Sequence, residues 1–127
     1  MGVRIVFRRR RVRRRAPPGQ KKYEAHKEHA RALVHLKLAH FNVHYELKLN
    51  RVFIKNSRSR WGSCSSKGNL NFNYRILFLR PELQDYLIVH ELCHLAHFNH
   101  SPEFWALVAE QAPDYKTLRR EIRKIRL

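Results

Sequence analysis

The sequence predicts an α+β fold, with an N-terminal helix, a small antiparallel sheet, and then three helices. One long segment without Gly or Pro carries apolar residues at helical spacing. Three short segments after it have strand patterns, and three further helical segments follow those. Strands and helices do not alternate, which argues against a parallel βαβ sheet. The 127 residues suffice for one domain with its own core.

The first helix is expected over residues 23–41. Asn42 is expected to end it. Its apolar face is predicted from residues that recur every three or four positions: Ala25, Ala32, Leu33, Leu36 and Ala39.

Strands are predicted at residues 52–54, 60–64 and 69–74. In residues 69–74, apolar and polar residues alternate strictly, so one face packs and the other meets solvent or a ligand. This segment is either an interior strand or an edge that could pair with an extended peptide. The Ser- and Gly-containing residues 63–68 have turn chemistry.

Proline and capping residues mark the starts of the three later helices. Pro81 suits the first turn of a helix that continues to His94. Ser101 followed by Pro102 predicts a second start, with the serine as N-cap. Asp114 is expected to cap the last helix.

Charge divides the chain into a basic arm and linker, residues 1–19, and a folded domain, residues 20–127. Lys and Arg number 27 against 10 acidic residues, a net charge of +17, and eight arginines lie in the first fifteen positions. Such a run is typical of a solvated tail, or of a segment that binds nucleic-acid phosphates non-specifically. Alternating apolar residues within the arm, Val3, Ile5 and Phe7, favour a short strand there.

The sequence favours a cytoplasmic location. No apolar run approaches the length of a membrane span, and no apolar segment follows the arginines as in a secretory signal. The two cysteines, Cys64 and Cys93, cannot form a disulfide framework.

Residues 90–94 read His-Glu-Leu-Cys-His on a predicted helix, the pattern H-E-x-x-H. His90 and His94 lie four apart on one helical face, so both imidazoles can reach one ion. Glu91 lies close enough to deprotonate a metal-bound water. Zinc suits this pattern because it accepts nitrogen ligands and can leave one position open. The alternative is a helix with two surface histidines and an ordinary acid.

A third ligand is expected from His100 rather than His97. Three ligands along one straight helix would spread over about 10 Å, too far to close around one ion. The chain must therefore bend back, and Asn99 tolerates the left-handed conformation that a bend can require. His97 is then a rim residue, a proton shuttle or a transition-state donor, or simply exposed.

Five sequence blocks resemble the YgjP-like (SprT-related) metallopeptidase family. They are residues 90–95 (HELCHL), 99–101 (NHS), 104–105 (FW), 59–69 (SRWGSCSSKGN) and 113–115 (PDY). They occur in the family's order and spacing, over about residues 23–123. The resemblance implies a minimal zincin-like fold with a zinc ion on three histidines.

The zinc ligands implied by this resemblance are His90, His94 and His100, and the implied catalytic residue is Glu91. Other residues of the upstream block are less defined. Arg60, Asn73 and His97 are the candidates for substrate or oxyanion binding. Trp61 is expected to be a core anchor, and Cys64 a small buried residue, since a fourth protein ligand would close the site.

The sequence therefore predicts a zinc-dependent metallopeptidase that hydrolyses peptide or protein substrates through a zinc-activated water, with Glu91 as general base. A metal-dependent nucleotide or phosphate-ester hydrolase is an alternative, because basic proteins attract polyanions. A nucleic-acid-binding module with a structural zinc is another. The intact Glu91 argues against the latter, since a structural site needs no base.

Overall fold

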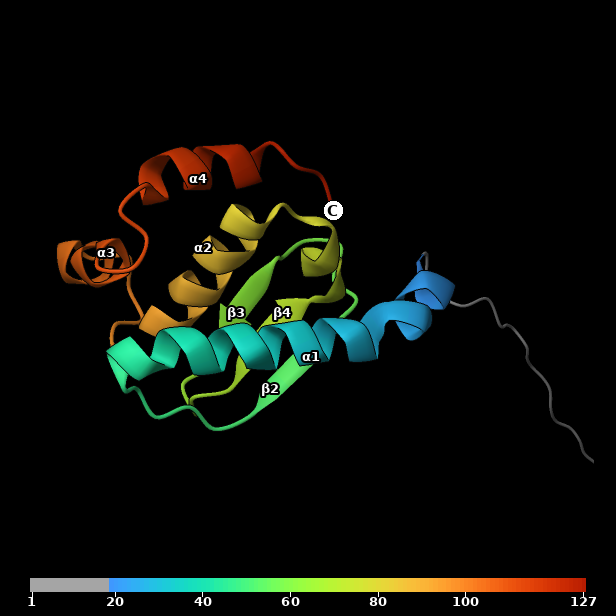
Figure 1. Cartoon of the computed structure of the whole chain (residues 1–127), viewed down its shortest axis with the longest axis horizontal. Helices are drawn as coiled ribbons and strands as arrows, with labels where there is room; N and C mark the ends of the chain where they lie inside the picture. The colour runs from blue at the N-terminus through green and yellow to red at the C-terminus, as the bar shows by residue number, and fades with distance from the viewer. Residues whose placement is uncertain (1–18) are drawn as a thin grey trace, which may run out of the picture.

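The computed structural model describes residues 19–127, and the strand and solvated tail predicted for the arm lie outside them. The elements are α1 (Gln20–Tyr45), β2 (Val52–Lys55), β3 (Gly62–Cys64), β4 (Leu70–Asn73), the 3-10 helix η3 (Tyr74–Phe78), α2 (Pro81–Cys93), α3 (Pro102–Ala109) and α4 (Tyr115–Arg123). Helix α1 packs against α2, η3 and β2, while α2 also contacts β3, α3 and α4 (Figure 1). No helix of the described residues is long and apolar enough to cross a membrane.

Helix α1 buries a different face from the one predicted. Its buried residues are spaced by three or four positions: Ala30, Val34, Leu38 and Phe41. Leu36, on the predicted face, is 71% exposed. The helix has apolar residues on more than one side, and the stripe that contains a β-branched residue and a phenylalanine is the one that packs.

The end of α1 also differs from the prediction. The helix continues past Asn42 to Tyr45, and the Asn42 side chain bonds to the segment beyond it. Its Nδ2 donates to the Leu47 carbonyl at 2.8 Å, and its Oδ1 accepts from the Leu47 amide at 2.9 Å. Glu46 ends the helix in the left-handed conformation, with φ 53°.

The sheet is mixed, whereas an antiparallel sheet was predicted. Its strand order is β2-β4-β3, with β4 parallel to β2 and antiparallel to β3. The loop of residues 56–61 carries the chain from one side of β4 to the other, which makes β2 and β4 parallel. The segment considered as an edge or an interior strand, β4, is therefore interior, and β2 and β3 are the two edge strands.

Asn73 holds that loop in place. Its Nδ2 donates to the carbonyls of Ser57 at 2.7 Å and Arg60 at 3.0 Å, and its Oδ1 accepts from the Arg75 amide at 3.0 Å. These bonds satisfy the buried amide and start η3 directly after β4. The loop that leads into β3 is thereby fixed to the central strand.

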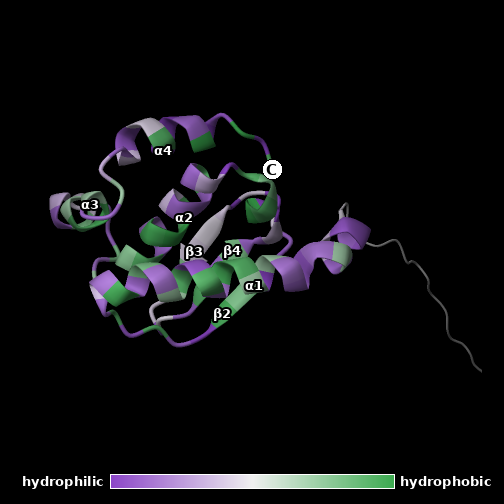
Figure 2. Cartoon of the chain, in the orientation of Figure 1, coloured by the Kyte–Doolittle hydropathy of each residue, from purple (hydrophilic) through white to green (hydrophobic). Residues whose placement is uncertain are grey.

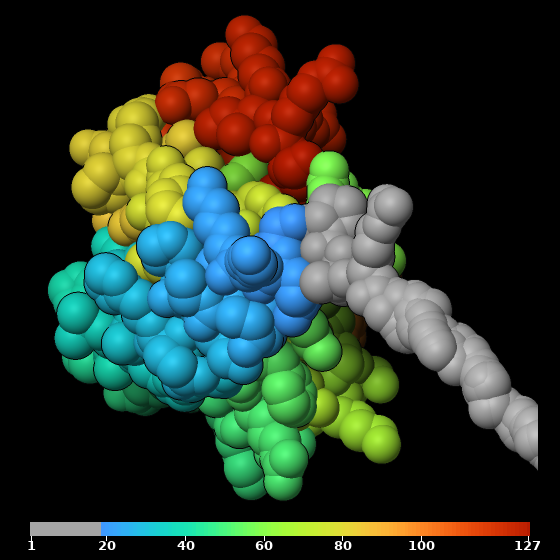
Figure 3. Space-filling model, turned by 90° about the vertical axis from the view of Figure 1, so that its right-hand side faces the viewer, coloured from blue at the N-terminus to red at the C-terminus, as the bar shows by residue number. Residues whose placement is uncertain are grey.

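The core lies between the sheet and the helices. It is formed by the inward residues of β2 and β4 and by most of α2, including Ile54, Leu70, Phe72, Leu83, Ile88, Val89 and Leu92. Figure 2 shows that β2 and part of α2 are hydrophobic, whereas most of α4 is hydrophilic. The start of α1 and the C-terminal end of the chain lie on one face of the molecule (Figure 3).

The starts of α2 and α3 follow the predictions. Pro81 opens α2, and the Ser101 hydroxyl accepts the Phe104 amide at 3.2 Å as the N-cap of α3. Asp114 precedes α4 but makes no side-chain cap bond. Asn99 is not left-handed, because Glu46 is the only non-glycine residue of the described chain with positive φ. The bend after α2 forms within ordinary backbone conformations.

Replacing Glu46 with Gly should raise the free energy of unfolding by about 1 kcal/mol, because Gly adopts the left-handed conformation without a Cβ clash. Glu28→Gly in the body of the same helix is the matched control, and it should lower that free energy by about 1 kcal/mol. Urea unfolding of both variants measures the difference. Destabilisation by Glu46→Gly would contradict the strain assigned to this position.

Candidate active site

Three histidines converge where α2 ends. His90 lies in the last turn of α2, His94 is its C-cap residue, and His100 directly precedes the N-cap of α3. Their Nε2 atoms are 3.2 Å apart for His90 and His94, 3.1 Å for His94 and His100, and 3.3 Å for His100 and His90. Ligands of one tetrahedral ion with bonds of about 2.0–2.1 Å lie about 3.3 Å apart. The three side chains could therefore hold one metal ion.

Hydrogen bonds orient two of these rings. His94 Nδ1 lies 2.9 Å from the carbonyl oxygen of His97. A carbonyl only accepts, so Nδ1 carries the proton and Nε2 keeps its lone pair. His90 Nδ1 lies 3.3 Å from the Tyr86 hydroxyl, one helical turn earlier on α2. Partners of this kind on the remote ring nitrogen are typical of metal-binding histidines.

Aromatic residues of α3 hold the rings from the other side. The Phe104 ring stacks on His94, with centroids 4.4 Å apart, and is fully buried. Trp105 stacks on His100 at 5.6 Å and on Tyr115 at 4.9 Å. The N-cap at Ser101 fixes where α3 begins, and so places both aromatic residues against the histidines.

The histidines are neutral at physiological pH. Burial, reinforced by the neighbouring His94 and His100, lowers the pKa of His90 to about 3. Burial also lowers the pKa of His94 and of His100. A neutral imidazole offers a lone pair, which metal binding requires.

Glu91 lies on α2 beside the histidines and is only 4% exposed. Its Oε1 has no hydrogen-bond partner among the described residues. Burial raises the pKa of Glu91 to about 8, and the Arg60 guanidinium acts in the opposite direction. A buried carboxyl oxygen without a partner is rare in proteins, and at this place it can bind a water molecule.

Strand β3 approaches Glu91 closely because it begins with a glycine. A Cβ at position 62 would lie 3.0 Å from the Asn71 carbonyl oxygen and 3.0 Å from both Cγ and Oε2 of Glu91. Those distances are shorter than ordinary van der Waals contact. Gly62 therefore lets the edge strand pass directly over the buried carboxyl group.

Two cavities flank the histidines. One, of about 250 Å³, is lined by Arg60, Trp61, Gly62, Tyr86, Leu87, His90, Glu91, His100, Arg119, Ile122 and Arg123. The other, of about 270 Å³, is lined by Arg60, Gly62, Ser63, Cys64, His90, Glu91, His94, Phe98 and His100. The two cavities adjoin one another and form one cleft across the site, because both are lined by Arg60, Gly62, His90, Glu91 and His100.

The structure brings only one of the three candidate substrate-binding residues into this cleft. Arg60 lines both halves, whereas Asn73 and the His97 side chain line neither. Trp61 is half-buried against the core, as expected for an anchor, but also lines the cleft. Cys64 is half-buried rather than buried, and burial raises the pKa of its thiol to about 11.

Sequence reasoning missed Tyr86, Arg119 and Arg123 as residues of the site. The i, i+4 spacing of Tyr86 and His90 was a signal for the first, since such pairs share a helical face. The arginines come from α4, which packs against α2. Only the tertiary fold brings that helix to the cleft.

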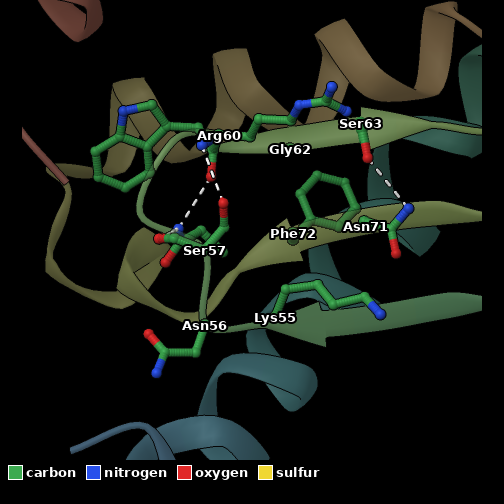
Figure 4. A pocket seen from close by; sticks show the side chains of 10 residues that line it. Lys55, Asn56, Ser57, Arg60, Gly62, Ser63, Asn71 and Phe72 are labelled. Atoms are coloured by element: carbon green, nitrogen blue, oxygen red, sulfur yellow. Dashed lines mark hydrogen bonds between the residues drawn. The ribbon is translucent and has the colours of Figure 1, made fainter. Parts of the chain in front are cut away.

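A larger cavity of about 450 Å³ lies on the other side of the loop of residues 56–61 (Figure 4). Lys55, Ser63 and Asn71 line it, and Asn71 Nδ2 donates to the Ser63 hydroxyl at 3.1 Å. Arg60 and Trp61 line both this cavity and the cleft, but no histidine reaches it.

Two solved structures share the fold. The crystal structure of the metallopeptidase zymogen of Pyrococcus abyssi abylysin is 22% identical, with a TM-score of 0.59 over 74% of this chain and 99% of that chain. That of the metallopeptidase zymogen of Methanocaldococcus jannaschii jannalysin is 21% identical, with a TM-score of 0.54 over 73% of this chain and 92% of that chain. No curated protein matches the sequence.

The family comparison covers nearly the whole chain. The model of the YgjP-like metallopeptidase domain matches residues 8–125, which include α1, the sheet and the three histidines. The α+β architecture, the family expected from the sequence and the peptidase activity are thus confirmed. The chain belongs to the YgjP-like family of metallopeptidases, whose chemistry requires a metal ion and acts on peptide or protein substrates.

Proposed function

We propose that His90, His94 and His100 bind a zinc ion and that Glu91 is the general base in peptide-bond hydrolysis. The observation that carries this proposal is the triangle of Nε2 atoms 3.1–3.3 Å apart. With the protons on Nδ1, as assigned for His94, the Nε2 lone pairs would repel one another without a cation between them. Their spacing matches the nitrogen spacing around a tetrahedral zinc ion.

The remaining chemistry of the site also fits zinc. Three nitrogen donors satisfy its ligand preference and leave one position for water or substrate. Cys64 lines the cleft but is absent from the convergent group, so the donor set remains three histidines. Glu91, whose Oε1 has no hydrogen-bond partner among the described residues, lines the cleft together with the histidines.

A zinc ion bound there supplies Lewis-acid chemistry that activates water and polarises a peptide carbonyl. A cation held by the histidines would lower the raised pKa of Glu91, so that its carboxylate could take the proton from the attacking water and later deliver it to the leaving amine. The fold shields this carboxyl group from bulk solvent under Gly62, so the transferred proton stays within the cleft. Arg60, which faces both cavities, stabilises negative charge as it develops on the carbonyl oxygen.

Strand β3 is the element against which an extended substrate binds. It is an edge strand of three residues. All three line one half of the cleft, and Gly62 lines the other half as well. A peptide that adds to this edge gains backbone hydrogen bonds and places its carbonyls beside the histidines.

The metal-site proposal predicts about one zinc ion per chain. Replacing His90, His94 or His100 with Ala should each abolish tight binding, whereas His97→Ala should not, because only its backbone carbonyl contacts His94. Zinc content after gel filtration, by elemental analysis, measures this. If His97→Ala lost zinc and His100→Ala retained it, His97 rather than His100 would be the third ligand.

The Glu91→Gln variant should keep zinc and lose roughly 10²–10⁴-fold in peptide turnover, because the amide cannot accept the proton at neutral pH. Metal content and hydrolysis of a peptide library should be measured on the same preparation. Unchanged turnover with retained zinc would refute the role of Glu91. Hydrolysis of nucleoside triphosphates without any cleavage of peptides would favour the phosphate-ester alternative.

The Gly62→Ala variant should reduce turnover more than it reduces zinc content. Its methyl group would press on Glu91 and on the Asn71 carbonyl, and this overpacking should cost about 1–3 kcal/mol of stability. Thermal unfolding and turnover should be followed together, below the melting temperature of the variant. Full activity would show that displacement of Glu91 does not affect turnover, and this would contradict its proposed role as general base.

A further inference from the structure

Three arginines gather in one half of the cleft. Arg60 comes from the loop before β3, and Arg119 and Arg123 come from successive turns of α4. Residues four apart share a helical face, which explains why both reach the same cavity. The only acidic residue that lines this cavity is the buried Glu91. We call the part of the cleft that these three arginines line the basic half.

None of the three arginines has a carboxylate partner. The ion pairs of residues 19–127 involve other basic side chains. Glu121, the acidic residue of α4, is held by Arg80 at 2.6 Å, outside this cavity. A guanidinium that lines a concave site without a partner is suited to binding an anion from outside.

The arginines are distributed unevenly about the histidines. Arg60 lines both cavities, whereas Arg119 and Arg123 line only one of them. Among the described residues, Arg60 is the only basic residue besides the histidines in the other cavity, which contains Ser63, Cys64 and Phe98. A general excess of basic residues would not by itself produce this asymmetry.

Arg119 is also held in place before any ligand binds. Its guanidinium lies 5.2 Å from the centroid of the Trp105 ring. Trp105 in turn stacks between His100 and Tyr115. A stacked guanidinium loses little conformational entropy on binding, which favours a specific anion site.

We propose that the basic half of the cleft binds a carboxylate of the peptide substrate, at one fixed position relative to the cleaved bond. This substrate preference rests on the proposed peptidase site. A guanidinium binds a carboxylate through parallel hydrogen bonds, and acidic side chains and a free C-terminus both offer that group. Either source places the peptide so that its neighbouring bond lies at the histidines.

The test uses zinc-loaded full-length protein and peptides in which Glu or Gln is moved along one sequence. Each peptide is made with a free and with an amidated C-terminus. The Glu peptide should be cleaved with a kcat/KM roughly tenfold higher than the Gln peptide, or the free-acid peptide roughly tenfold higher than the amidated one. The difference should come mainly from a lower KM. Mass spectrometry of the products locates the carboxylate relative to the cleaved bond, and the amidated series distinguishes the two sources.

Arg119→Gln and Arg123→Gln should each remove this preference, so that kcat/KM for the carboxylate-bearing peptide falls roughly tenfold, to that of the amidated Gln peptide. Arg120→Gln is the matched control, because it removes the same charge from the same helix outside the cavity. Equal turnover of Glu and Gln peptides with either C-terminus would overturn the proposal. So would an Arg120→Gln effect as large as that of Arg119→Gln.

Binding to zinc-loaded Glu91→Gln protein separates this proposal from the proposed function. Calorimetry with the same peptides should show tighter binding of the carboxylate-bearing peptide and loss of that difference on adding Arg119→Gln. If wild-type protein cleaves no peptide, this measurement still decides whether the basic half binds a carboxylate. Equal affinities for the Glu and Gln peptides, with either C-terminus, would overturn the proposal.

Discussion

Three imidazole nitrogens that face one another at 3.1–3.3 Å impose the constraint around which this small domain is arranged. Rings that carry their protons on Nδ1 gain nothing from such an approach, because their Nε2 lone pairs repel. The surrounding structure must therefore hold them, and it does so with a hydrogen bond to His94 from one side and aromatic stacking from the other. The end of α2 and the start of α3 are both needed, since each supplies part of the cage.

Polar contacts position the edge strand β3 beside the site. The Asn73 side chain donates hydrogen bonds to two carbonyls of the loop before β3. That loop determines where β3 lies relative to α2. Gly62 then allows contact with Glu91 at a distance that no side chain would permit. A domain this small has few elements to pack around its site. The position of β3 therefore depends on the buried Asn73 amide and on the absence of a Cβ at Gly62.

The sequence was most informative where chemistry and local structure coincide. His90 and His94 follow from helical spacing, and the start of α3 follows from Ser101 and Pro102. Expectations failed where distant segments decide the outcome. The buried face of α1 depends on which of its apolar stripes meets the sheet, and the parallel pairing of β2 with β4 depends on a loop whose path has no local signal. For the same reason, the arginines of α4 could not be assigned to the cleft.

The aromatic stack on α3 links the two halves of the proposed chemistry. Trp105 stacks on His100, and the Arg119 guanidinium lies over the same Trp105 ring at 5.2 Å from its centroid. The ring that orients a proposed metal ligand therefore also orients a proposed substrate-binding group. Because aromatic stacking and cation–π contacts depend on position within a few ångströms, a shift of α3, which carries Trp105, would alter both at once. In so small a domain, the placement of one tryptophan couples substrate selection to the geometry at the histidines.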